Sequence, residues 1–129
     1  MLLKELYVIS EKKADANGVV HIRLKLQKAH EVFAGHFPGH PVLPGVAMLQ
    51  MVKEFSEEHL ERSLLMQQFS QVKFLALVDP SVASELNFTM HFERHTDGIS
   101  VKNTTTFPDG SIVLKCNVTF VVTNDTRIP

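Results

Sequence analysis

The sequence has 129 residues, 44% of them hydrophobic, with a formal net charge of -1 at neutral pH. This length suits one domain, residues 1–129, that buries a core without disulfides or metal. The near-zero charge and scattered basic residues exclude an electrostatic footprint for nucleic acid, and no apolar run is long enough to span a bilayer. The single cysteine, Cys116, is expected to be a small buried side chain. We find no signal peptide and expect a cytoplasmic protein.

The amino-terminal half begins with two predicted elements before a long loop. Residues 1–10 predict a first strand or a short helix. Residues 15–18 supply a turn, and residues 20–26 alternate apolar and polar side chains, which is typical of a strand with one buried face.

One helix is predicted from about Pro44 to about His59, since proline is tolerated in a first helical turn. One side of this helix carries an apolar stripe of Gly45, Met48, Leu49, Val52 and Phe55. Val46, Ala47, Gln50 and Glu54 occupy another side.

The carboxyl-terminal half predicts further strands. Residues 72–78 are almost wholly apolar, which suggests a strand covered on both faces, and residues 86–92, 99–101 and 112–122 alternate with period two. Glycine ends each of the short connections at residues 95–98 and 107–110, as hairpins require. We therefore expect an α+β fold in which one antiparallel sheet wraps around a single helix. The exposed sheet edges lead us to expect dimerisation.

The most informative segment is residues 35–45, Gly-His-Phe-Pro-Gly-His-Pro-Val-Leu-Pro-Gly, which fixes His36 in a rigid loop just before the helix. This segment resembles the signature G-H-F-P-x-x-P-x-x-P-G-V of the beta-hydroxyacyl-(acyl carrier protein) dehydratases, the FabZ/FabA-like hot-dog family. The positions that match are Gly35, His36, Phe37, Pro38, Pro41, Pro44, Gly45 and Val46. A second family segment is matched by Lys73, Phe74, Val78 and Pro80, although Ser81 replaces the usual glycine. The resemblance covers essentially the whole chain and implies a hot-dog fold.

The resemblance also implies a chemistry for the loop. His36 would remove the α-proton of a 3-hydroxyacyl thioester, and loss of the 3-hydroxyl would give the trans-2-enoyl product of a hydro-lyase. The backbone carbonyl of Val42 would hold the imidazole, and the N–H of Gly45 would polarise the thioester carbonyl. A helix amino terminus suits that second role, because its N–H groups and dipole favour developing negative charge. Phe37, Pro44 and Val46 complete the substrate-binding set.

The chain departs from the family at its second catalytic residue. The family carries Asp or Glu fourteen positions after the histidine, facing the histidine of the other subunit, and here that position is Gln50. An amide forms hydrogen bonds but does not donate a proton to a leaving hydroxyl.

Three alternatives follow from this departure. His36 could carry both proton transfers while Gln50 orients the hydroxyl or a water. Glu54, one turn further along the helix, could supply the carboxylate, although an ordinary solvated or paired glutamate is the simpler interpretation. The chain could instead be a catalytically silent acyl- or carrier-protein-binding subunit that partners an active homologue. We rank the dehydratase first, in fatty acid biosynthesis or in related lipid or polyene biosynthesis.

The resemblance also predicts the substrate and the assembly. The acyl chain would lie between the helix and the sheet, against Phe33, Phe37, Leu49, Val72, Phe74 and Phe88. The expected partners are an acyl carrier protein, whose phosphopantetheine arm holds the acyl chain, and a second copy in a homodimer or higher homo-oligomer. No cofactor is expected for this elimination. No metal is expected either, since Pro38 and Gly39 prevent His36 and His40 from sharing a helical face.

Overall fold

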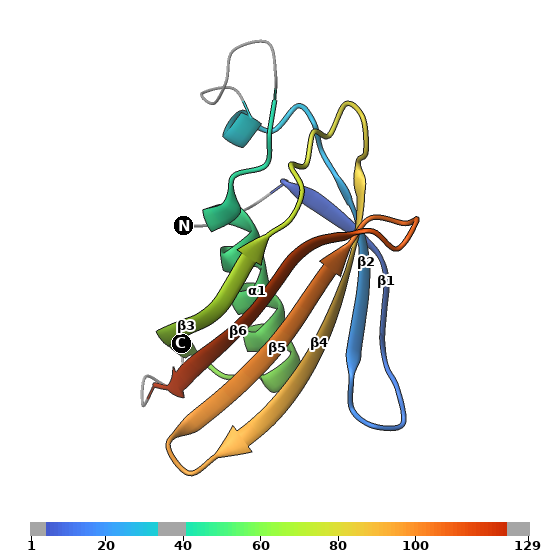
Figure 1. Cartoon of the computed structure of the whole chain (residues 1–129). Coiled ribbons are helices and arrows are strands. Elements are labelled where there is room, and N and C mark those ends of the chain that lie inside the picture. The colour runs from blue at the N-terminus through green and yellow to red at the C-terminus, as the bar shows by residue number, and fades with distance from the viewer. Residues whose placement is uncertain (1–4, 34–40, 124–129) are drawn as a thin grey trace.

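Within residues 5–33 and 41–123, which the computed structural model describes, six strands form one antiparallel sheet and one long helix covers a face of it (Figure 1). In chain order the elements are β1 (Tyr7–Ala14), β2 (Val20–Leu26), the short 3-10 helix η1 (Glu31–Phe33), α1 (Gly45–Leu60), β3 (Leu64–Phe74), β4 (Glu85–His95), β5 (Gly98–Thr106) and β6 (Ile112–Val122). The strand order is β1-β2-β4-β5-β6-β3, so β1 and β3 form the two edges. The predicted α+β architecture is confirmed, and the amino-terminal element is a strand.

The helix α1 lies one residue later than predicted. Pro44 has extended backbone angles (φ -63°, ψ 144°) and precedes the first helical residue, Gly45. At the other end Glu61 adopts a left-handed conformation (φ 53°), and its N–H donates to the carbonyl of Glu57. This bond satisfies one of the carbonyls that a helix end leaves without a partner.

The buried face of α1 is wider than the predicted stripe. Its buried residues are Ala47, Met48, Met51, Val52, Phe55 and Ser56. Ala47, which the sequence placed on another side than the apolar stripe, is buried too, because the curved sheet wraps around the helix and covers more than one stripe. Phe55 lies at the centre of this contact, with its ring edge-on to Phe88 of β4 at a centroid distance of 5.2 Å.

The period-two alternation predicted for the other strands is largely confirmed. The residues of β2, β4, β5 and β6 that point toward α1 and are buried are Val20, Ile22, Leu24, Leu26, Leu86, Phe88, Met90, Ile99, Val101, Leu114, Cys116, Val118 and Phe120. Phe92 and Ile112 are half-buried, and Val122 is exposed near the end of β6. These strands thus present one apolar face to the helix.

The prediction of a strand over residues 72–78 with both faces covered was wrong. Strand β3 starts at Leu64 and ends at Phe74, and the side chains of Leu75 and Leu77 are 55% and 78% exposed. Strand β3 extends as far as it pairs with β6. This pairing passes through two register shifts, and Gln71 within it has a left-handed backbone conformation (φ 53°). In the following segment Val78 is fully buried and Ala76 is half-buried against the core.

The two predicted hairpin glycines have different roles. Gly110 has a φ of 91°, which favours glycine in this turn as expected. Gly98 is instead required by space, because a Cβ there would collide with the backbone carbonyl oxygen of Phe120 on β6. The β4–β5 hairpin and β6 pack closely at this point.

Candidate active site at the start of helix α1

The segment before α1 is held by a backbone hydrogen bond. The N–H of Leu43 donates to the carbonyl of Val78 at 2.8 Å, and the Leu43 side chain is buried. Pro44 then sets the extended geometry from which the helix starts. This anchoring places Val42, Pro44 and Gly45 together at one end of the helix.

The first two amides of α1 have no acceptor among the helix residues. The N–H groups of Ala47 and Met48 both donate to the carbonyl of Pro44, at 3.0 and 3.3 Å. The N–H groups of Gly45 and Val46 therefore have no acceptor within the helix. Val46 is 70% exposed, so this end of the helix is open at its second residue.

An aromatic ring covers the backbone of Gly45. A Cβ at Gly45 would lie 2.7 Å from Cζ of Phe74, at the end of β3, so the glycine lets the ring approach the helix start. The ring itself is 47% exposed. The predicted Gly45 and Phe74 are thus in contact, and together they form an apolar wall beside the first amides of the helix.

Gln50 lies further along the helix and is bonded to a carboxylate. Its Nε2 donates to Oε2 of Glu54 at 3.1 Å, and the hydroxyl of Tyr7 on β1 lies 3.5 Å from Oε1 of the same carboxylate. All three side chains are half-buried. Burial, and then the negative charges of Glu54 and Glu58, raise the pKa of the Tyr7 phenol to about 12. The phenol therefore keeps its proton at ordinary pH and is a donor to Glu54.

Glu54 is a paired helix glutamate, and its nearest partner is Gln50. The alternative that Glu54 supplies a carboxylate to the reaction stays a prediction. The spacing of four residues between Gln50 and Glu54 is a signal that the sequence offers. The participation of Tyr7, 47 residues away, was missed because only the tertiary structure brings β1 beside the helix.

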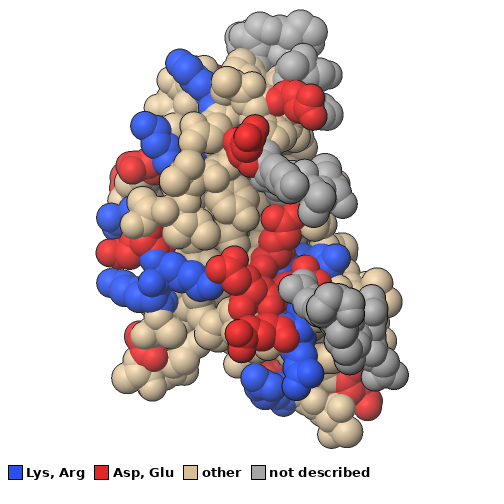
Figure 2. All heavy atoms as spheres, turned by 180° about the vertical axis from the view of Figure 1, so that it is seen from behind, with Lys and Arg blue, Asp and Glu red and all other residues tan. Residues whose placement is uncertain are grey.

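Carboxylates gather on the face of the molecule that carries α1. Figure 2, which shows this face, has acidic side chains concentrated along its middle. The helix contributes Glu54, Glu57 and Glu58, and Glu58 pairs with Lys12 of β1 at 3.1 Å. The Gln50 amide thus lies at the edge of an anionic region.

Several predicted site residues lie outside the described part of the chain. His36, Phe37 and His40 fall within residues 34–40, so their predicted positions stay predictions. Of the predicted acyl-chain contacts, Phe33 and Phe88 are buried in the core, and Leu49 and Val72 are half-buried against it. Cys116 is buried as predicted, and burial raises its thiol pKa to about 11.

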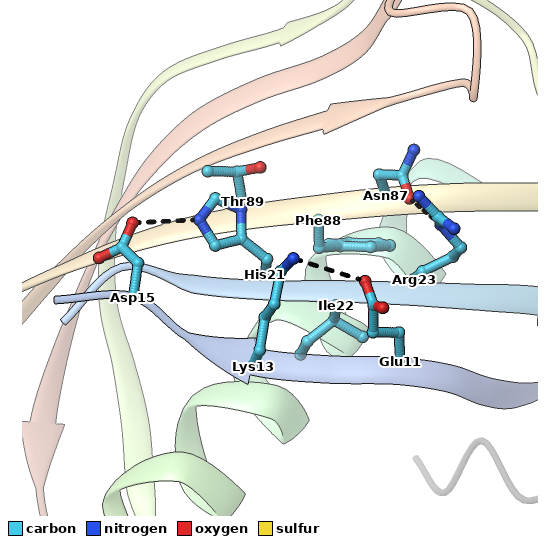
Figure 3. A pocket seen from close by; sticks show the side chains of 9 residues that line it. All are labelled: Glu11, Lys13, Asp15, His21, Ile22, Arg23, Asn87, Phe88 and Thr89. Atoms are coloured by element: carbon cyan, nitrogen blue, oxygen red, sulfur yellow. Dashed lines mark hydrogen bonds and ion pairs between the residues drawn. The ribbon is translucent and has the colours of Figure 1, made fainter. Parts of the chain in front are cut away.

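A hollow of about 400 Å³ is lined by residues of β1, β2 and β4 and of the turn after β1 (Figure 3). It contains a histidine and a carboxylate, since Nε2 of His21 lies 3.3 Å from Oδ2 of Asp15. Arg23 also donates to the side chain of Asn87 at 3.2 Å. The polar groups pair with one another in β1, β2, β4 and the turn after β1, so we do not assign catalysis to this hollow.

Residues 5–33 and 41–123 contain no group of three metal-ligating side chains. Among the same residues, no helix is long and apolar enough to cross a membrane.

Comparison with known proteins identifies relatives of the chain. The model of the ApeI-like family, described as ApeI dehydratase, matches residues 10–110. The 3-hydroxyacyl-(acyl-carrier-protein) dehydratase FabZ of Lactococcus lactis is 29% identical over 121 residues, which cover 88% of this chain and 75% of that protein. FabZ of Latilactobacillus sakei is 30% identical over 98 residues, which cover 70% of this chain and 69% of that protein.

Solved structures share the fold at lower identity. The dehydratase heterocomplex ApeI:P from Xenorhabdus doucetiae matches with a TM-score of 0.73 and 19% identity, covering 88% of this chain and 96% of that one. A hypothetical thioesterase from Streptococcus pneumoniae, crystallised with coenzyme A, matches with a TM-score of 0.64 and 16% identity, covering 91% of this chain and 85% of that one. At these identities the structures establish a shared fold and no more.

Proposed function

We propose that this chain, which belongs to the ApeI-like dehydratase family, removes water from 3-hydroxyacyl thioesters of acyl carrier protein to give trans-2-enoyl thioesters. The observation that carries the proposal is the open start of α1, where the amides of Gly45 and Val46 have no acceptor within the helix and lie directly after the His36 loop. A thioester carbonyl bound there would gain negative charge during proton removal, and helix-terminal N–H groups stabilise such charge.

The proposed elimination uses His36 for both proton transfers. Its imidazole takes the proton from C2, and the electrons of the C2–H bond form an enolate-like anion whose oxygen faces the amide of Gly45. The C3–O bond then breaks as the C2–C3 double bond forms, and the imidazolium returns the same proton to the departing hydroxyl as water. An imidazole suits this cycle because its ordinary pKa lies near neutral pH.

The other predicted residues orient the substrate in this scheme. The carbonyl of Val42 would hold the imidazole, while Phe37, Pro44 and Val46 would flank the thioester, and Phe74 adds an apolar wall beside it. Gln50 would bind the 3-hydroxyl without donating a proton to it. The likeness of FabZ, whose name specifies acyl-carrier-protein substrates, supports the choice of carrier.

Assembly completes the proposed site, because the family places the histidine and the helix residue on different subunits. Strand β3 is a sheet edge with Leu65 60% and Phe69 43% exposed, which suits pairing with a second copy. We therefore propose a homodimer or higher homo-oligomer, and the cytoplasm as its compartment.

The test is to incubate the purified protein with 3-hydroxyacyl carrier-protein thioesters of several chain lengths and to follow enoyl absorbance. We expect product from the wild-type protein and none from His36→Ala. Gln50→Ala should still form product more slowly. Absence of product at every chain length with a folded wild-type protein would contradict the proposal.

One observation favours a second candidate, a silent subunit that works beside an active homologue. The position of the family's acid carries an amide whose N–H is already committed to Glu54, and the name of the ApeI:P structure describes a heterocomplex. Under this alternative the isolated chain would be inactive. Activity would appear only when a homologue with a carboxylate at the equivalent helix position is added.

A further inference from the structure

We propose that Glu54 is a positioning residue that turns the carbonyl oxygen of Gln50 toward the substrate's 3-hydroxyl. This inference rests on the proposed function. It specifies which atom of the amide meets the substrate and names the residue that selects that atom.

The hydrogen bond between the two side chains determines the orientation of the amide. A carboxylate only accepts hydrogen bonds, so the atom of Gln50 that lies 3.1 Å from Oε2 of Glu54 must be the nitrogen. The carbonyl Oε1 of Gln50 then points away from Glu54. Without a carboxylate at position 54, the amide could present either its oxygen or its nitrogen.

Tyr7 supports this arrangement from β1. Its hydroxyl lies 3.5 Å from the other oxygen of Glu54, and its ring is edge-on to Phe55 at a centroid distance of 5.3 Å. The carboxylate is therefore bordered by a donor on each oxygen. Bonds to a charged acceptor are stronger than neutral ones, so the amide is held more firmly than by a neutral partner.

The fixed orientation has a chemical consequence. A 3-hydroxyl that donates its hydrogen to Oε1 of Gln50 leaves its lone pairs free to receive the proton from the imidazolium. An amide presented through its nitrogen would instead donate to the hydroxyl oxygen and occupy a lone pair. The pair of Glu54 and Gln50 thus favours the orientation that leaves both lone pairs of the hydroxyl oxygen open to the imidazolium.

The test compares Glu54→Gln with Glu58→Gln. The first variant keeps the size of the side chain but replaces one acceptor oxygen by a donor NH₂ group, so both orientations of the Gln50 amide can occur. The second removes a carboxylate one turn further on that is exposed and paired with Lys12. We expect kcat for a 3-hydroxyacyl thioester to fall about tenfold in Glu54→Gln, with unchanged thermal stability, and to change less than about twofold in Glu58→Gln.

A binding measurement with unreactive probes distinguishes failure of this inference from failure of the proposed dehydratase activity. The probes are a short 3-hydroxyacyl pantetheine amide and the same amide without the hydroxyl, neither of which is expected to eliminate during the measurement. We expect the wild-type protein to bind the hydroxylated probe about five to ten times more tightly, and Glu54→Gln to lose this preference. That preference without turnover would refute the dehydratase and keep the inference. Equal binding of the two probes by the wild-type protein, or no binding of either, would overturn the inference.

A spectroscopic measurement checks the orientation itself. The side-chain amide signals of Gln50, assigned by their loss in Gln50→Glu, should shift in Glu54→Gln and stay in place in Glu58→Gln. Unchanged signals in Glu54→Gln would show that the two side chains do not bond in solution, and would overturn the inference.

Discussion

Replacing Gln50 by glutamate would place two carboxylates one helical turn apart. In the native chain Nε2 of Gln50 lies 3.1 Å from Oε2 of Glu54, so the new carboxylate would face an existing one. Two unit charges about 4 Å apart repel by about 4 kcal/mol at an effective dielectric constant of about 20, which equals about 3 pKa units. Both positions are half-buried, so water screens part of this repulsion. We expect the pKa of one carboxyl to rise by roughly one to two units.

The raised pKa predicts how the stability of Gln50→Glu depends on pH. Protonation favours the folded state of this variant, so its stability should match the wild type near pH 4 and fall behind as pH rises through about 6. The loss should reach about 2 kcal/mol at neutral pH, measured by denaturant unfolding at a series of pH values. The double variant Gln50→Glu with Glu54→Gln is the matched control, because it carries only one of the two charges.

The same substitution predicts a gain in activity at mildly acidic pH. A carboxyl that keeps its proton near pH 6 can protonate the leaving hydroxyl, so turnover should rise relative to the wild type at pH 6 and lose this advantage by pH 8.

The stability prediction has a clear refuting outcome, which is a stability difference between Gln50→Glu and the wild type that does not change between pH 4 and 8. It would show that positions 50 and 54 do not face each other.

Three further predictions concern other parts of the fold. Gly98→Ala should cost about 3 kcal/mol of unfolding free energy, because the new Cβ would meet the backbone carbonyl of Phe120, and an unchanged denaturation midpoint would contradict this close packing. Gly45→Ala should change the unfolding free energy by less than about 1 kcal/mol, since the half-exposed ring of Phe74 can swing away, but its new methyl should crowd the thioester and lower dehydratase kcat/KM by about tenfold or more; full activity would show that the thioester does not lie against residue 45. The thiol of Cys116, with its pKa raised to about 11 by burial, should react with a thiol reagent at pH 8 only after denaturant is added.

The sequence predicted the strands that alternate cleanly and missed the edge strand that does not. In β2 and β4 every second side chain faces the helix, so the period-two pattern located them within a few residues. The segment 64–71 has no such alternation and becomes a strand because β6 pairs with it through register shifts. Local pattern carries no information about such long-range pairing, which explains why the start of β3 was missed.

The candidate site likewise has features that the sequence could predict and contacts that only the tertiary structure shows. The helix start was predictable because Pro44 and Gly45 determine where the chain can enter α1. The bond between Gln50 and Glu54 follows from helical spacing, although the choice of this pairing over solvation required the structure. The contacts of Tyr7 with Glu54 and of Phe74 with Gly45 join distant strands to the helix, so a sequence pattern could not reveal them.

An amide at the family's acid position is compatible with the proposed elimination because the reaction conserves protons. The proton that leaves C2 equals the proton that the hydroxyl needs, so one imidazole balances the reaction if it reaches both atoms on the same face of the substrate. A second acid would remove the need for the imidazole to reach the hydroxyl. Without one, the elimination depends on holding the hydroxyl within reach of the imidazole. A group that accepts the hydrogen of this hydroxyl leaves both oxygen lone pairs open to the proton. Under our proposal Gln50, turned by Glu54, provides that acceptor, so the two residues should be studied as one unit.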